Sequence, residues 1–310
     1  MMDILGTHEN GGEIARLTIG SKRLSAEILT LGSILSAVRL DKGPNMTVPP
    51  PDPLTHGRDA AFTGPVVGPV VNRLTLPVSL DGQPLDLAAN DPAGYLLHSG
   101  DGGTDNRIWT VTEESDTATT LAIDLRHGLG GFPGNRRIEA RWTISDTELH
   151  LSLTATTDRA TLMNVAHHPY WALDGAMAGQ GGHQMISPAR RYTPTNEVFL
   201  PTGDILPVSG SDYDFTRLAE PAPTLDANLV LGDRDADTPQ PAATLISHGG
   251  RRLDVLTTAP GIQVFTGKPF GIALEPQLWP NAPAHPAFPS FRLAPDETFR
   301  QNTIYRFSEV

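Results

Sequence analysis

The chain contains no cysteine among its 310 residues. Disulfides, thiolate metal ligands and a cysteine nucleophile are therefore excluded, and any catalysis must use other side chains. Long apolar runs are also missing, because the longest, such as GPVVGPVV at 64–71, fall far short of the roughly 20 residues that span a bilayer. The first residues have no basic region followed by an apolar core, so we expect no secretory signal and a cytoplasmic protein.

Basic residues are also in short supply. Lys and Arg number 23 against 35 Asp and Glu, which gives a formal net charge of −12. A negative surface repels phosphate backbones and anionic lipid headgroups, so we expect neither nucleic acid nor a membrane as partner. Hydrophobic residues make up 39% of the chain and charged residues 19%, which is typical of a folded protein. The same negative charge gives no positive field to gather strongly anionic substrates.

A helical period is the third absence. No stretch keeps an apolar residue every 3.6 positions, and LDANLVL at 225–231 predicts no more than a turn. Apolar residues alternate with polar ones instead, as in RIEARWTI at 137–144 and LHLSLTA at 149–155, which predict a hairpin with one face on a core. The same alternation predicts strands at 13–20, 23–32, 119–127 and 302–310.

Many short strands separated by Gly, Pro and Asp predict an all-β fold, a large antiparallel β-sandwich or a barrel. No shift in composition marks a domain boundary, and the polar stretches at 51–60 and 232–242 are typical of loops within a fold. We therefore expect one domain over residues 1–310.

Two adjacent histidines stand in an apolar, aromatic run, NVAHHPYWALDG at 164–175. A metal site would need a spacing such as His-x-His with a carboxylate, whereas neighbouring residues of a strand point to opposite faces. We therefore expect no metal here, and we expect His167 and His168 to face different surroundings. From the residues alone, His168 is either an imidazole hydrogen-bonded in the core or a catalytic group.

Further polar residues interrupt apolar runs. Glu275 is expected at the end of a buried strand, where desolvation would raise its pKa toward the range of a general base, unless it forms a structural ion pair. His98 ends an apolar strand before a Gly-rich loop that lacks the Lys and the helix of a phosphate loop. Asn72 and Arg73 must find hydrogen-bond partners, either in a structural network or on a polyhydroxyl ligand.

These stretches belong to an ordered set that covers most of the chain. Its members are VVNRL at 70–74, LLHSGDGGTDNRIW at 96–109, GFPGN at 131–135, NVAHHPYWALDG at 164–175, YTPTNEVFLPTGDILPVSGSDYDF at 192–215, LDANLVL at 225–231, GIQVFTGK at 261–268 and GIALEPQLWPNAPAHPAFPSFRLAPDETF at 271–299. The set resembles the aldose 1-epimerase (galactose mutarotase) family. The resemblance implies a β-sandwich of the supersandwich type and an isomerase that needs no cofactor and no metal.

The resemblance also implies roles for single residues. Glu275 matches the catalytic base and His168 the catalytic acid, with His98 assisting at the ring oxygen or a neighbouring hydroxyl of the sugar. We expect the carboxylates of Glu275 and Asp226 to favour the protonated form of His168. His167 replaces an Asn of the family and should face the other way. The implied sugar-binding residues are Asn72, Arg73, His98, Tyr170, Asp226 and Gln263.

The implied substrate is a free hexose such as galactose or glucose, turned over by a monomer or a homodimer. Ser99, Trp171, Ala172 and a short link before Glu275 depart from the family pattern and leave the natural aldose open. Trp171 or Trp279 either lies against the sugar ring or packs in the core. The alternatives are an epimerase of another aldose or of a hexose 6-phosphate, a non-catalytic sugar-binding protein, and a glycoside hydrolase, which would need a second carboxylate beside Glu275.

Overall fold

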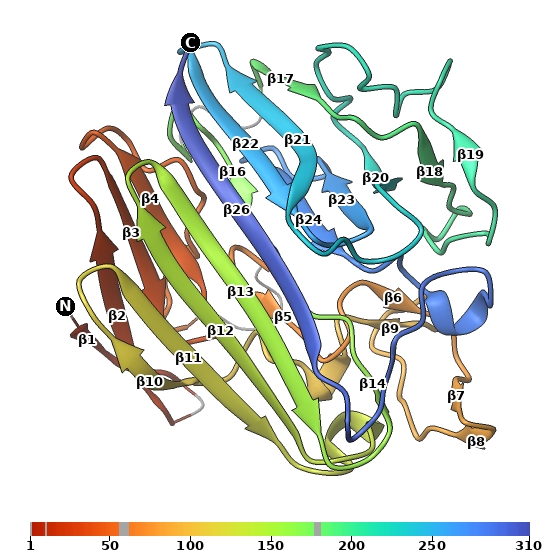
Figure 1. Ribbon diagram of the computed structural model, residues 1–310. Coiled ribbons are helices and arrows are strands. Elements are labelled where there is room, and N and C mark those ends of the chain that lie inside the picture. Colours follow the sequence, from red (N-terminus) through yellow and green to blue (C-terminus); the bar gives the residue numbers. More distant parts are fainter. Residues whose placement is uncertain (1, 10, 56–61, 177–180) are drawn as a thin grey trace.

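The computed structural model describes residues 2–9, 11–55, 62–176 and 181–310 (Figure 1). Its largest element is an eight-stranded sheet that crosses the whole molecule, and the C-terminal strand β26 runs through its middle. All neighbouring strands in this sheet are antiparallel. In spatial order the strands are β10 (Thr110–Glu114), β11 (Ala118–Leu125), β12 (Arg136–Ser145), β13 (Glu148–Thr157), β26 (Phe299–Glu309), β22 (Arg251–Thr257), β21 (Gln240–Ser247) and β17 (His183–Ile186).

Two further sheets complete the second layer. One has four strands, β1 (Met2–Thr7), β2 (Glu13–Gly20), β3 (Leu24–Leu29) and β4 (Leu35–Leu40), in sequence order. The other has six, in the order β16 (Tyr170–Trp171), β24 (Ile272–Gln277), β23 (Gly261–Phe265), β20 (Asp226–Val230), β18 (Arg191–Thr193) and β19 (Leu206–Pro207). Both are antiparallel throughout.

Short paired segments and 3-10 turns connect these sheets. The pairs are β5 (Val66–Val67) with β15 (Ala166–His167), β6 (Arg73–Leu74) with β9 (Leu96–Leu97), β7 (Ser79–Leu80) with β8 (Gln83–Pro84), and β14 (Thr161–Leu162) with β25 (Arg292–Leu293). The helical elements of the described residues are the 3-10 turns η1 (Gly100–Gly102), η2 (Leu129–Gly131) and η4 (Ala282–Ala284). No described helix is long and apolar enough to cross a membrane.

One hydrophobic cluster joins the three large sheets. Ile19 of β2, Trp142 of β12, Tyr305 of β26 and Val264 of β23 are all members, and each is at most 1% exposed. The four-stranded and six-stranded sheets therefore pack on the same face of the eight-stranded sheet. This arrangement confirms the predicted large antiparallel β-sandwich.

The hairpin of β12 and β13 shows why the alternation of apolar and polar residues predicted strands correctly. Ile138, Ala140, Trp142 and Ile144 are buried, while the residues between them are partly or fully exposed. Trp142 lies opposite Leu151 across the pair, so both apolar sets face the same core. The predicted strands at 13–20, 23–32 and 119–127 are likewise present, and the closing strand begins three residues earlier than predicted.

Three expectations need correction or restriction. Within residues 225–231, which were predicted as a turn, Asp226–Val230 form strand β20 of the six-stranded sheet; the prediction missed it because a five-residue strand with Asp and Asn carries little propensity of its own. Glu275 lies inside β24 and not at its end. Strand β21 already begins at Gln240, within the predicted 232–242 loop, and residues 56–60 of the other predicted loop lie outside the described residues.

Candidate active site

A cavity of about 270 Å³ opens beside the six-stranded sheet. All eight residues that the sequence indicated for the site line it, although they come from segments far apart in the chain. The structure adds Phe62, Leu97, Phe265 and Lys268. The complete lining is Phe62, Asn72, Arg73, Leu97, His98, His168, Tyr170, Asp226, Gln263, Phe265, Lys268 and Glu275.

Strand register places the polar lining on one face of the six-stranded sheet. Gln263 of β23 lies directly opposite Glu275 of β24, and both therefore point the same way. Asn228 of β20 is opposite Gln263, so Asp226, two residues before it, projects from the same face. The residues between them, such as Val264 and Leu274, belong to the hydrophobic core. These strands are thus buried on both faces, one apolar and one polar.

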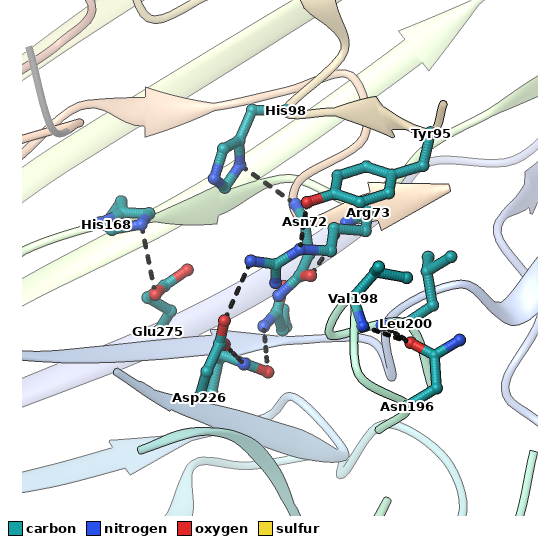
Figure 2. A network of polar contacts seen from close by, with 12 residues as sticks. Asn72, Arg73, Tyr95, His98, His168, Asn196, Val198, Leu200, Asp226 and Glu275 are labelled. Carbon is teal, nitrogen blue, oxygen red and sulfur yellow. Dashed lines mark hydrogen bonds and ion pairs between the residues drawn. The ribbon is translucent and has the colours of Figure 1, made fainter. Parts of the chain in front are cut away.

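The centre of the site is the contact between His168 and Glu275. His168 follows strand β15, and its Nε2 lies 3.3 Å from Oε1 of Glu275 (Figure 2). The two side chains are 6% and 2% exposed. The other polar atoms of the pair, Nδ1 of His168 and Oε2 of Glu275, are buried and have no hydrogen-bond partner among the described residues. Each can therefore gain or lose a proton without breaking a hydrogen bond to a described residue.

Burial drives both pKa values toward the neutral forms. It lowers the pKa of His168 from 6.5 to about 4. Burial, with the charge of Asp226 adding to it, raises the pKa of Glu275 well above its usual value. The expectation that nearby carboxylates would favour an imidazolium is wrong in direction, because desolvation outweighs them. Between these two pKa values the pair carries a single proton, which is one to donate and one position to accept.

Arg73 and Asp226 form the second buried contact of the pocket. Nη2 of Arg73 lies 3.0 Å from Oδ2 of Asp226, and these side chains are 15% and 7% exposed. Gln263 donates to Oδ1 of Asp226, and Nε of Arg73 donates to the hydroxyl of Tyr95 (Figure 2). Asp226 is thus held by two donors, whereas the carboxyl of Glu275 faces an imidazole.

The segment around His98 is held in an uncommon backbone conformation. Asn72, His98 and Ser99 all have positive φ, at 65°, 49° and 64°. The backbone N–H of Asn72 donates to Nδ1 of His98 at 3.1 Å, so the ring carries its proton on Nε2. Burial, then the charges of His168 and Arg73, hold the pKa of His98 well below its usual value. His98 is therefore a neutral hydrogen-bond donor.

Ser99 replaces a Gly expected from the resemblance, and its side chain takes up a structural task. Its hydroxyl accepts from the N–H of Val70 and donates to the carbonyl of Val70, both at 2.8 Å. These two bonds tie the His98 segment to the strand end that carries Asn72 and Arg73.

Three aromatic or imidazole side chains lie behind the pocket, not in it. His167 faces away from His168 as predicted, and its Nδ1 lies 2.9 Å from the hydroxyl of Tyr305. Trp171 stacks against Tyr305 in the core, and Trp279 packs edge-on against Phe288. Neither Trp lines the cavity, so the structure favours the alternative that both pack in the core.

Two phenylalanines of the lining, Phe62 and Phe265, were not among the residues indicated by the sequence. Phe62 packs on His98 with ring centroids 4.3 Å apart, and Phe265 lies edge-on to Tyr170. Phe265 and Lys268 sit just after the quoted Gln263, so their neighbourhood was the available signal. Phe62 stands outside the quoted motifs. No group of three His, Asp or Glu side chains suited to a metal ion occurs among the residues described.

The fold and the pocket define a class of protein, a large antiparallel β-sandwich with a buried contact between an imidazole and a carboxyl group in a pocket lined by polar side chains. The chain belongs to the aldose 1-epimerase family, whose model matches residues 15–306. Galactose mutarotase from Homo sapiens is 28% identical and aldose 1-epimerase from Escherichia coli K12 is 27% identical. The first alignment covers 96% of this chain and 95% of the relative, and the second covers 98% and 94%.

Solved structures show the same fold. A GalM/aldose epimerase homologue from C. elegans superposes with a TM-score of 0.85 at 24% identity and covers 95% of this chain and 99% of its own. Galactose 1-epimerase from Lactobacillus acidophilus superposes with a TM-score of 0.86 at 22% identity and covers 100% and 99%. Membership of the aldose 1-epimerase family makes the protein an isomerase and not a glycoside hydrolase.

Proposed function

We propose that the protein interconverts the α and β anomers of a free aldohexose such as galactose or glucose, with Glu275 as general base and His168 as general acid. The observation that carries the proposal is the buried 3.3 Å contact between the two groups inside a pocket lined by hydrogen-bonding side chains. The names of the relatives, galactose mutarotase and aldose 1-epimerase, support the choice of sugar.

Anomer exchange needs two proton transfers, one at each of the two oxygens bonded to C1. In the reacting form the single proton of the pair sits on His168, so the carboxylate of Glu275 takes the proton of the O1 hydroxyl while the imidazolium of His168 donates its proton to the ring oxygen, and the bond between C1 and that oxygen breaks. The product is the open aldehyde beside a protonated Glu275 and a neutral His168, which are the forms that burial favours. After rotation about C1–C2, the same groups return the protons and close the ring on the other face.

The remaining polar lining would hold the sugar. Arg73 and the N–H of the His98 ring offer donors, Asp226 offers an acceptor, and Asn72 and Gln263 offer an amide each. Tyr170 lies beside His168, with ring centroids 5.3 Å apart, and adds a hydroxyl. Because these groups come from segments between Asn72 and Glu275 that share one pocket, we propose that residues 1–310 act as a single domain.

One observation favours a second candidate, an epimerase of a hexose 6-phosphate. Lys268 lines the same pocket as Arg73 and adds a second cation to it. Acceleration of glucose 6-phosphate mutarotation well above that of glucose would favour this candidate.

Polarimetry on freshly dissolved α-D-galactose and α-D-glucose tests the proposal. We expect the protein to speed relaxation to the unchanged final rotation, and we expect Glu275→Gln to lower kcat by about 10²–10⁴-fold, as removal of a general base does. Glu139→Gln is the matched control, because Glu139 is a partly exposed carboxylate on β12. Near-normal turnover of Glu275→Gln would contradict the assigned role, and a silent wild-type protein would contradict the function.

A further inference from the structure

Phe199 combines two unfavourable features. Its side chain is 46% exposed, and its backbone is in the left-handed region with φ at 61°. A bulky residue rarely adopts that conformation, which suits Gly at little steric cost. If this segment were only a turn, Gly would fit the backbone conformation with less strain, so the presence of Phe needs another reason.

The loop around Phe199 is built to hold this conformation. Oδ1 of Asn196 accepts hydrogen bonds from the N–H groups of Val198 and Leu200, at 3.1 and 3.0 Å (Figure 2). The N–H of Phe199 donates to the carbonyl of Asn196, and the N–H of Asn196 donates to the carbonyl of Leu200. An isolated β-bridge between Thr195 and Pro201 closes the loop. The position of Phe199 is thus fixed by its own loop.

The ring of Phe199 faces the guanidinium of Arg73. The carbon at the centre of that group lies 5.4 Å from the Phe199 ring centroid and 5.7 Å from the Tyr95 ring centroid. These distances are within cation–π range. Tyr95 is buried and also accepts a hydrogen bond from Nε of Arg73, whereas Phe199 comes from the surface. Asp226 holds the remaining end of the guanidinium.

We propose that Phe199 is a positioning residue that fixes the guanidinium of Arg73 and shields its contact with Asp226 from water. The inference rests on the proposed function, in which Arg73 grips a hydroxyl of the sugar. The strain of a left-handed phenylalanine is then retained because it improves substrate binding. Phe199 has no part in the proton transfers at Glu275 and His168.

The test is a set of loop variants measured by polarimetry and by urea unfolding. We expect Phe199→Gly to raise KM about two- to fivefold, the factor equivalent to a partly exposed cation–π contact, with kcat unchanged. Its KM should also rise more steeply with salt, because the Arg73–Asp226 pair becomes open to screening. Its unfolding midpoint should stay equal to that of the wild type or exceed it. Phe199→Tyr, which keeps an aromatic ring, should retain the KM of the wild type. Val198→Ala, in the same loop, should change neither KM nor its dependence on salt.

Asn196→Ala separates positioning from stability. It should raise KM like Phe199→Gly, but it should lower the unfolding midpoint because the N–H groups of Val198 and Leu200 lose their acceptor. An unchanged KM and salt response in Phe199→Gly would overturn the inference, as would a loss confined to kcat. Failure of the proposed function is distinct, since it would appear as an inactive wild-type protein.

Discussion

The acid sensitivity of the fold should depend on His167. This residue is 1% exposed, contacts the Tyr305 hydroxyl and lies edge-on to Trp142, with ring centroids 5.0 Å apart. Its Nε2 is buried without a hydrogen-bond partner among the described residues. Burial, with the neighbouring His168 adding to it, lowers the pKa of His167 from 6.5 to about 3. The substitution His167→Asn removes this titration and does not touch the lining of the pocket.

The magnitude follows from proton linkage. Below the unfolded pKa near 6.5, the unfolded chain binds a proton at this histidine that the folded protein refuses. The contribution of His167 to stability is therefore complete above that pH and falls by about 1.4 kcal/mol per pH unit as the pH drops toward its folded pKa. Between the unfolded pKa and about pH 5, the loss due to His167 is about 2 kcal/mol.

Three other buried groups act in the same pH range. His98 and His168 also have lowered pKa values and add losses of the same sign. Glu275 has a raised pKa, so its contribution is present at low pH, is lost as the pH rises, and opposes the losses from the histidines. His167→Asn leaves these three groups in place, so by about pH 5 the variant should lose about 2 kcal/mol less stability than the wild-type protein.

Urea unfolding at about pH 7.5 and about pH 5, followed by Trp fluorescence, measures both losses. The variant starts from a lower stability because Tyr305 loses its partner, so the comparison concerns the change with pH and not the absolute value. Polarimetry at neutral pH serves as the control, and it should find kcat retained. Equal losses in the two proteins would refute the assignment of a buried neutral imidazole at His167.

Two further predictions concern the pocket. The pH profile of kcat/KM should stay flat through neutral pH and fall on the acid side only near pH 4, where His168 takes a second proton and leaves the pair without a base; an acid limb near 6.5 would contradict this. Asp226→Asn should lower the free energy of unfolding in urea by about 3 kcal/mol, because Arg73 keeps a largely buried charge without its counter-ion. The same variant should move the alkaline limb to lower pH, since the charge of Asp226 helps to raise the pKa of Glu275; an unmoved limb would argue against that coupling.

The sequence alone determined the class of fold and indicated which polar side chains could form the site. Strands such as β12 and β13 border the solvent on one side, so their alternation records which face is buried. Strand β20 does not show this alternation of buried and exposed residues, because its second face lines a pocket instead of meeting solvent. Its Asp and Asn residues are also typical of turns, so the sequence did not predict a strand here. The roles of the candidate residues came from motif resemblance, since a lone buried His or Glu has several possible explanations.

Only the tertiary structure decided how those residues act together. His168 and Glu275 are more than a hundred positions apart in the sequence, and their contact exists because β15 and β24 meet at one pocket. Their protonation depends on burial, which no local sequence pattern shows. For His168, burial lowers the pKa, whereas the sequence predicted that nearby carboxylates would raise it. Likewise, the ring of Phe199 meets Arg73 only through folding, and the placement of Trp171 and Trp279 in the core was settled there as well. Local sequence encodes which faces of a strand are apolar, whereas pKa values and long-range contacts depend on everything packed around a group.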